Sequence, residues 1–259
     1  MDTLLYVEGL VVSFDGFVAL RNLNLILERR ERIRLLIGPN GAGKTTLFDA
    51  LTGQVKPVSG RVLFKDHTNL LGLSEHAIAN HGVIRKFQTP SVFPDHTVFE
   101  NMVLSSGRKR FLATIVARAG SPEQDGIAEV LEQVGLLQHA NERAGTLSHG
   151  QKQWLEIAML LVQSPTLLLL DEPVAGMTRG EKEKTVALLD LIVQRSTCTI
   201  VLIEHDMQFV RQIARRGHRV TVLHEGSVLS EGSIERVQSD ERVIEAYLGR
   251  GKVSAEAPC

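Results

Sequence analysis

A short glycine-rich stretch constrains the fold of this chain more than any other segment. Residues 38–46 read Gly-Pro-Asn-Gly-Ala-Gly-Lys-Thr-Thr and satisfy the phosphate-binding pattern G-x-x-x-x-G-K-[ST]. The apolar residues 33–37 before it predict a buried strand, and residues 46–51 after it predict a helix that Gly53 stops. A turn between strand and helix aims backbone N–H groups and the positive helix end at phosphate oxygens. The stretch therefore predicts a nucleoside triphosphate site in which Lys44 reaches the β- and γ-phosphates and Thr45 binds Mg²⁺.

Composition limits the class of protein. The 259 residues are 43% hydrophobic and 23% charged, as in globular proteins with one large or two small domains. A net charge of −1 gives no bulk attraction to nucleic acid or anionic membranes. The longest apolar runs, such as residues 167–170, are too short to span a bilayer, and the N-terminus lacks a signal-peptide pattern. Cys198 and Cys259 do not suggest a disulfide framework. We expect a cytosolic protein that works at a membrane only through partners.

The hydrophobic pattern predicts an α/β chain with a helical insertion. Two β-rich stretches, residues 4–11 and 18–27, flank a turn, where Phe14 is either a core residue or a platform for a nucleotide base. The charged residues 28–32 predict a solvent-exposed corner. From Thr97 to about Ala140 the periodicity is helical without strands, which favours an insertion.

Strands and helices alternate again from Ser148 onward. Ser148 is a plausible N-cap of a helix whose apolar face holds Trp154, Ile157, Ala158 and Leu161. Residues 178–195 predict a long amphipathic helix, residues 199–203 a buried strand, and residues 219–229 a hairpin.

Acidic residues follow a buried strand at residues 167–170. Asp171 and Glu172 come at its carboxyl end, the edge of open parallel sheets where ligands bind. Two acidic residues there usually cap a turn. Beside a phosphate loop, we instead predict that Asp171 holds Mg²⁺ and that Glu172 polarises the attacking water. Glu204-His205-Asp206 repeats the arrangement after another strand, although a histidine at a strand end is more often structural.

A second anion site is predicted at residues 147–151, Leu-Ser-His-Gly-Gln, where a helix begins. Since the chain already has a phosphate loop, this site makes sense if it faces the nucleotide of a partner molecule. The phosphate loop, Gln88, residues 147–151, residues 167–173 and His205, in that order, resemble the nucleotide-binding subunit of ABC transporters. The resemblance covers residues 4–249, essentially the whole chain.

The resemblance implies an α/β P-loop NTPase fold of the ABC ATPase type. This fold has a RecA-like core, an N-terminal antiparallel β subdomain and a helical signature subdomain. We expect a single domain over residues 1–250, with the helical subdomain at about residues 97–162 and a polar tail at residues 251–259. The implied ligands are ATP and Mg²⁺.

The resemblance also assigns roles residue by residue. Phe14 matches the aromatic residue that stacks on adenine, and Ser148 and Gly150 match signature residues that close over the γ-phosphate held by another subunit. The matched nucleotide contacts are Phe14, Gly38, Pro39, Asn40, Gly41, Ala42, Gly43, Lys44, Thr45, Thr46, Ser148, His149, Gly150 and Gln151. The matched catalytic residues are Lys44, Gln88, Glu172 as general base and His205 as switch histidine. The matched Mg²⁺ ligands are Thr45, Gln88 and Asp171.

Several segments narrow the subfamily. Residues 85–93, 147–157, 172–178 and 243–249 look like those of branched-chain-amino-acid-type importers, and most like the urea importer's ATP-binding subunit. The resemblance implies an ATPase that powers import of urea, or alternatively of branched-chain or other amino acids. The implied partners are transmembrane permeases and a second ATP-binding subunit, a paralogue or the same chain. A periplasmic binding protein would act indirectly, and the chain would lie on the cytoplasmic face of the inner membrane.

Two other functions are less favoured. An exporter ATPase has a similar cassette, but the residues near Val92 and the histidine signature favour an importer. Soluble ABC ATPases that act on DNA or ribosomes usually have a long coiled-coil insertion or two cassettes. This chain has one cassette, a short insertion and balanced charge, so we expect no nucleic-acid partner.

Four residues depart from the family pattern. His149 replaces a common signature glycine, and Thr178 stands where aspartate is common in the loop that crosses the dimer interface. Glu31 and Ile84 stand where glycines are usual. A turn at Glu31 that needs a positive φ would be strained by about 1 kcal/mol or more. We expect the last two to affect stability rather than activity.

Overall fold

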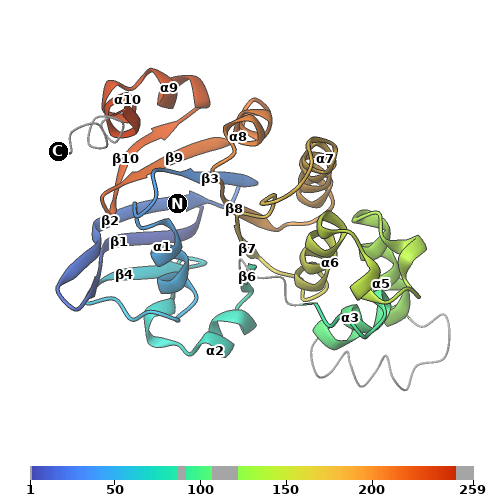
Figure 1. Cartoon of the computed structure of the whole chain (residues 1–259). Coiled ribbons are helices and arrows are strands. Elements are labelled where there is room, and N and C mark those ends of the chain that lie inside the picture. Colours follow the sequence, from blue (N-terminus) through green and yellow to red (C-terminus); the bar gives the residue numbers. More distant parts are fainter. Residues whose placement is uncertain (1, 87–91, 107–121, 249–259) are drawn as a thin grey trace, which may run out of the picture. The chain divides into compact units, whose positions relative to one another are not determined.

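The computed structural model describes residues 2–86, 92–106 and 122–248. These residues form two compact units (Figure 1). The first unit comprises Met1–His81 and Thr199–Cys259, and the second comprises Gly82–Cys198. The phosphate loop and His205 belong to the first unit, whereas Asp171, Glu172 and Ser148 belong to the second. Each unit is therefore described by itself.

An antiparallel sheet forms one part of the first unit. Its strands run in the order β2-β1-β4-β5: β1 (Thr3–Phe14), β2 (Phe17–Glu28), β4 (Ser59–Phe64) and β5 (Thr68–Asn69). Asp15 and Gly16 join β1 to β2 with φ of 46° and 89°, the positive values of a two-residue hairpin turn. The predicted pair of strands is confirmed. Phe14 pairs with Phe17 at the end of the hairpin and is 44% exposed. The alternative prediction that Phe14 is a core residue is therefore wrong.

The second set of strands in this unit carries the phosphate loop. Its order is β10-β9-β3-β8: β3 (Ile33–Ile37), β8 (Thr199–Ile203), β9 (Arg219–His224) and β10 (Ser227–Gly232). β3 pairs in parallel with β8 and β9, and β9 and β10 form the predicted hairpin. Every residue of β3 and β8 is buried, as expected of parallel strands covered on both faces. The helices of this unit are α1 (Lys44–Leu51), α2 (Glu75–Asn80), α8 (Met207–Ala214), α9 (Ile234–Ser239) and α10 (Glu241–Leu248), with a 3₁₀ turn at Leu70–Gly72.

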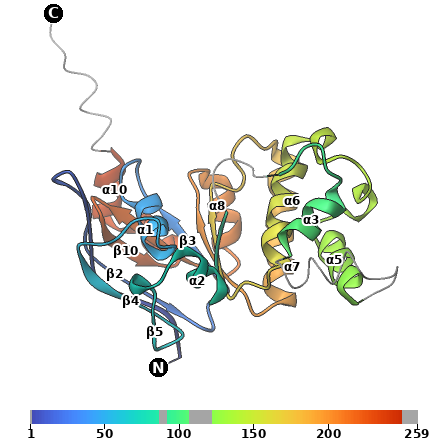
Figure 2. The same cartoon turned by 90° about the horizontal axis from the view of Figure 1, so that it is seen from below.

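The second unit is mostly helical (Figure 2). Among its described residues, the strands β6 (Val83–Lys86) and β7 (Leu167–Asp171) pair in parallel. Its helices are α3 (Val98–Ser105), α5 (Pro122–Gln133), α6 (His149–Leu161) and α7 (Arg179–Arg195), with 3₁₀ turns at Leu137–His139 and Ala144–Thr146. Thr97, Ser148 and Thr178 each form a capping box with the residue three positions later, so the starts of α3, α6 and α7 are fixed locally.

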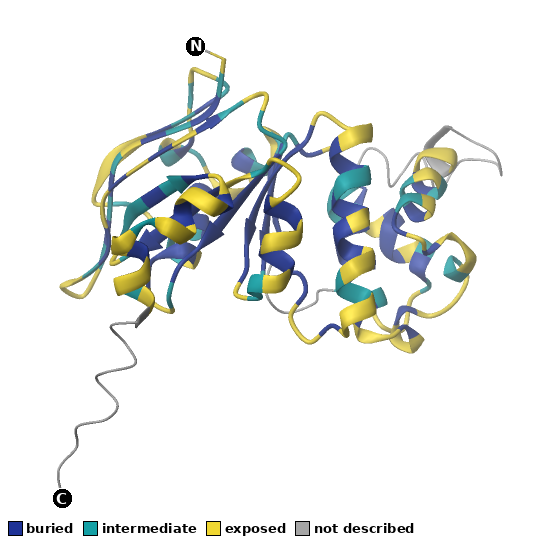
Figure 3. Cartoon of the chain, turned by 90° about the horizontal axis from the view of Figure 1, so that it is seen from above, coloured by how far each residue is buried: buried dark blue, intermediate teal, exposed yellow. Residues whose placement is uncertain are grey.

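Burial follows the predicted patterns with one adjustment. The strands β3, β6, β7 and β8 are buried throughout, β1 and β2 mix buried and exposed residues, and the helices have a buried and an exposed face (Figure 3). On α6, Ile157 and Ala158 are buried as predicted, but Trp154 and Leu161 are only partly covered. Leu155 takes a core position instead. Among the described residues, no helix is both long and apolar enough to cross a membrane.

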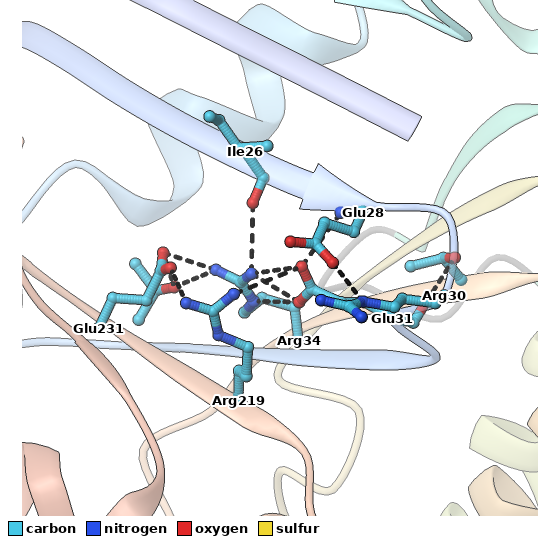
Figure 4. A network of polar contacts seen from close by, with 9 residues as sticks. Ile26, Glu28, Arg30, Glu31, Arg34, Arg219 and Glu231 are labelled. Atoms are coloured by element: carbon cyan, nitrogen blue, oxygen red, sulfur yellow. Dashed lines mark hydrogen bonds and ion pairs between the residues drawn. The ribbon is translucent and has the colours of Figure 1, made fainter. Parts of the chain in front are cut away.

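The charged corner at residues 28–32 is not simply solvent-exposed, as the sequence suggested. The side chain of Glu31 is only 8% exposed and pairs with Arg34, whose side chain is fully buried (Figure 4). Arg34 also donates to Glu231 at 2.6 Å, to Thr221 at 2.8 Å and to the Ile26 carbonyl at 3.2 Å. Glu31 is not among the described residues with positive φ, so the strain expected there is absent. Together with Glu231, the Glu31 carboxylate balances the charge of the buried arginine.

Candidate functional site

The phosphate loop follows the carboxyl end of β3 and requires glycine at two of its fixed positions. Gly38 has a φ of 151°, and a Cβ there would lie 2.1 Å from the Leu223 carbonyl oxygen. Gly43 has a φ of 96°, and a Cβ there would lie 2.6 Å from a methyl of Leu20 and 2.8 Å from the Ala19 carbonyl oxygen. The glycines of the pattern therefore let the loop pack closely against neighbouring backbone.

The loop is built to receive an anion. α1 begins at Lys44 and its N-cap is Gly43, which has no side chain that could occupy the first N–H groups of the helix. The Lys44 ammonium donates to the carbonyls of Gly38 at 2.8 Å and Pro39 at 3.0 Å, which folds the side chain back over the loop. Thr45 is exposed beside it. A phosphate chain placed here would meet a helix N-terminus and a lysine together.

His205 lies at the same sheet edge as the phosphate loop. It follows the carboxyl end of β8, which runs parallel to β3, and it is exposed. The buried Glu204 accepts from the backbone N–H groups of His205 at 3.1 Å and Asp206 at 3.5 Å. Asp206 in turn caps α8. Sequence reasoning missed the role of Glu204, although an acidic residue directly after a buried strand was a usable signal.

In the second unit, Asp171 ends β7 and is fully buried. Its Oδ2 accepts from Nη2 of Arg85 at 3.0 Å, and the Arg85 side chain is only 5% exposed. This role of Arg85 was not predicted from the sequence. The available signal was the pair of charged residues, Arg85 and Lys86, that follows two apolar residues in β6, whose four residues are all buried. The ion pair holds the carboxylate at the end of the strand.

Glu172 has an unusual backbone. Its φ of 48° lies in the left-handed region, which costs a non-glycine residue on the order of 1–3 kcal/mol. Pro173 follows, and the Glu172 carbonyl accepts from the Ala175 N–H at 3.2 Å, which closes a turn. Strained residues of this kind cluster at functional sites, which agrees with the catalytic role predicted for Glu172.

The start of α6 is tied to the loop before α7. Ser148 Oγ accepts from the Gln151 N–H at 3.2 Å, and Gln151 Oε1 accepts from the Ser148 N–H at 2.9 Å. Gln151 therefore has a capping role in the chain itself. His149 Nε2 lies 3.0 Å from the Ala175 carbonyl oxygen. A Cβ on Gly176 would approach the same histidine nitrogen to 3.2 Å.

Thr178 and Glu181 complete this arrangement. Thr178 caps α7, and the Glu181 carboxylate accepts from the Thr178 N–H at 2.9 Å. The same carboxylate accepts from the Ser148 hydroxyl at 3.3 Å. The two departures, His149 and Thr178, thus make defined contacts within the second unit. The role of Glu181 was not predicted from the sequence, because its contact with Ser148 joins two different helices.

The predicted site residues are partly described. The phosphate loop and His205 share one sheet edge in the first unit. In the second, His149 contacts the loop at residues 175–176, and Ser148 and Gly150 lie against Glu181 on α7. Gln88 lies outside the described residues. Among the residues that are described, no group of three or more His, Cys, Asp or Glu side chains could hold a metal ion by itself. The predicted Mg²⁺ ligands Thr45, Gln88 and Asp171 would offer hydroxyl, amide and carboxylate oxygen atoms, which are of the kind this ion prefers.

Comparisons with known proteins cover almost the whole chain. A family model described as "ABC transporter" matches residues 20–175, and one described as "Branched-chain amino acid ATP-binding cassette transporter" matches residues 227–253. The high-affinity branched-chain amino acid transport ATP-binding protein LivG of Escherichia coli (strain K12) is 40% identical over 254 residues, which are 95% of this chain and 98% of LivG.

Two solved structures extend the likeness to three dimensions. The ADP conformation of an ATP-binding cassette of an ABC transporter superposes with a TM-score of 0.82 at 27% identity, over 96% of this chain and 100% of that one. A bacterial ABC transporter cassette solved as a dimer has a TM-score of 0.73 at 25% identity, over 89% of this chain and 98% of that one.

Proposed function

We propose that this chain powers the uptake of branched-chain amino acids. The premise is that it belongs to the ABC transporter family of ATP-binding subunits, in its branched-chain amino acid importer type. The predicted fold class and the predicted ATPase activity of the family are confirmed by the family match and the structural likeness. The bounds expected for the helical subdomain, about residues 97–162, stay a prediction.

The substrate assignment rests on one observation, the 40% identity to LivG over 95% of the chain. It is supported by the match of residues 227–253 to the branched-chain amino acid family model. The motifs alone favoured urea first and branched-chain amino acids second. The comparisons support the second choice better, and we adopt it.

Different residues of the chain would bind the nucleotide and carry out phosphoryl transfer to water. Lys44 and the backbone N–H groups at the start of α1 would bind and neutralise the β- and γ-phosphates of ATP, while Phe14 would stack on adenine. Glu172 would accept a proton from the attacking water and His205 would hold the γ-phosphate. Transfer to water needs mainly positioning and charge stabilisation, and these side chains supply both. Thr45, Asp171 and Gln88 would hold Mg²⁺, which adds positive charge against the phosphates.

The remaining assignments concern partners. We propose that the chain works in a pair of cassettes, with Ser148 and Gly150 of one facing the nucleotide of the other, as a relative solved as a dimer supports. The second cassette would be a paralogue or a copy of this chain. Permeases would bind the pair at the cytoplasmic face of the membrane, and a periplasmic binding protein would deliver the substrate to them.

Glu172→Gln tests the ATPase assignment. Loss of a general base lowers rate by about 10²–10⁴, so we expect ATP to bind, hydrolysis to nearly stop and a dimer to accumulate with ATP on size-exclusion chromatography. Glu183→Gln is the matched control, since Glu183 is an exposed residue on α7 paired with Arg179. A Glu172→Gln protein that hydrolyses ATP normally contradicts the assignment, and one that binds ATP but stays monomeric rules out a pair made of two copies of this chain. Uptake of labelled leucine and labelled urea by a deletion strain then decides the substrate.

A further inference from the structure

The N-terminus of α6 already holds an anion from its own chain. Ser148 is the N-cap of this helix of 13 residues, and the Glu181 carboxylate, from α7, accepts from its hydroxyl at 3.3 Å. Glu181 also lies close to the Gly150 backbone, because a Cβ on Gly150 would come within 2.3 Å of the Glu181 Oε1. The carboxylate thus lies against the two residues assigned to the nucleotide of a second cassette.

The pKa of Glu181 agrees with this geometry. It is lowered, first because the Thr178 backbone N–H donates to the carboxylate, and further because the Thr178 hydroxyl, the Ser148 hydroxyl and the Gly150 backbone donate to it. Donors of this kind stabilise an ionised oxygen. The start of α6 and the cap of α7 therefore form a cradle for one negative charge.

The Glu181 carboxylate and a phosphate cannot both accept the hydrogen bond that this cradle offers from Ser148. A serine hydroxyl has one proton to donate, so Ser148 donates either to Glu181 or to a phosphate oxygen. Two negative groups in contact would also repel each other. A phosphate that binds Ser148 and Gly150 must therefore displace the Glu181 carboxylate from them.

We propose that Glu181 is a positioning residue that occupies the phosphate place at the start of α6 until the nucleotide of a second cassette displaces it. This inference rests on the proposed function, since it takes Ser148 and Gly150 as contacts of that nucleotide. Glu181 also binds Thr178, in the loop assigned to the dimer interface. When Glu181 withdraws, it therefore affects both segments assigned to the dimer interface, the start of α6 and the loop before α7. Its carboxylate sets the ATP concentration needed to close the pair of cassettes.

Glu181→Gln tests the proposal in the Glu172→Gln protein, in which ATP-bound dimers accumulate. The amide keeps an oxygen for the Thr178 N–H but removes the competing charge, so half-maximal dimerisation should need about tenfold less ATP. The measurement is an ATP titration followed by light scattering, with thermal unfolding recorded alongside. If Glu181 only capped α7, its loss would leave the ATP requirement unchanged or raise it.

The chain offers a matched control in Glu100. Glu100 takes the same position in the capping box of α3, where it accepts from the Thr97 N–H at 2.7 Å, and its pKa is also lowered, chiefly by that bond. Glu100→Gln in the Glu172→Gln protein should shift the ATP requirement less than about twofold. If Glu181→Gln unfolds, Glu181→Asp serves instead: it withdraws the carboxylate from Ser148 and should also lower the ATP requirement.

The outcomes separate the two proposals. If the Glu172→Gln protein hydrolyses ATP normally, the proposed function and this inference both fail. If it binds ATP without dimerising, the role of Glu181 in a pair of two copies of this chain is overturned. If it dimerises, but Glu181→Gln and Glu181→Asp need as much ATP as the parent or more, only the role of Glu181 is overturned.

Discussion

Arg34→Met is expected to destabilise the first unit strongly without touching the nucleotide residues. Arg34 is fully buried at the start of β3, and its guanidinium binds both oxygens of Glu31, with Nη2 at 2.7 Å from Oε1 and Nε at 2.8 Å from Oε2. Methionine fills a similar volume but brings no charge. Glu31, only 8% exposed, would then keep Arg219, 3.9 Å away, as its remaining cationic partner among the described residues.

The size of the effect follows from this burial. Removing one partner of a buried ion pair costs about 3–5 kcal/mol, because the other charge is left in a poorly solvated place. A chain of this length loses about 2–4 °C of Tm per kcal/mol, so Tm should fall by about 6–20 °C. Glu231 is affected less, since it is 27% exposed and keeps its bond to Arg219 at 2.6 Å.

Calorimetry and urea unfolding of the purified variants measure this change. Arg61→Met is the control, because Arg61 pairs with Glu8 at 3.3 Å while both side chains are more than 40% exposed, and such pairs contribute less than about 1 kcal/mol. Adding Glu31→Gln to Arg34→Met should recover part of the lost stability, since the stranded charge is gone. An Arg34→Met protein that unfolds within about 2 °C of the parent would refute the argument.

Two further predictions concern the nucleotide residues. Lys44→Ala should weaken ATP binding by about ten- to a hundredfold in calorimetric titration, because a charge-assisted contact to phosphate is lost; an unchanged affinity would contradict the role of Lys44. Arg85→Met removes the guanidinium from the fully buried Asp171, so Tm should fall by several degrees in the absence of nucleotide, and ATPase activity should fall with it. An unchanged Tm would show that this ion pair does not stabilise the end of β7.

Local signals account for the features that the sequence predicted correctly. The glycine pattern at residues 38–46 needs positive φ and close packing at Gly38 and Gly43, and it can be read without knowing the fold. Ser148 and Thr178 mark the starts of α6 and α7 in the sequence, because a capping box spans only four residues. The continuous apolar run of β8 likewise predicts a buried parallel strand from neighbouring residues alone.

The polar contacts that the sequence did not predict join residues far apart in the chain. Arg34 and Glu231 are 197 positions apart, Arg85 and Asp171 are 86 apart, and Ser148 and Glu181 are 33 apart. No window of sequence contains both partners, so each charged residue alone suggests a solvent-exposed position. Glu31 and Arg34 are only three positions apart, but Arg34 also binds the distant Thr221 and Glu231, so its burial could not be inferred locally and residues 28–32 were expected to be an exposed corner.

The sequence by itself indicated the family, through the resemblance of its ordered motifs to a known one. It also determined the phosphate loop and most element boundaries, because these depend on short-range rules of backbone conformation, capping and hydrophobic periodicity. Only the tertiary structure decided that Glu31 is a buried partner of Arg34, that Asp171 is held by Arg85, and that Glu181 lies at the start of α6. The physical reason is that a charge can be buried only where an opposite charge or a set of donors meets it, and the packing of distant strands and helices brings those groups together.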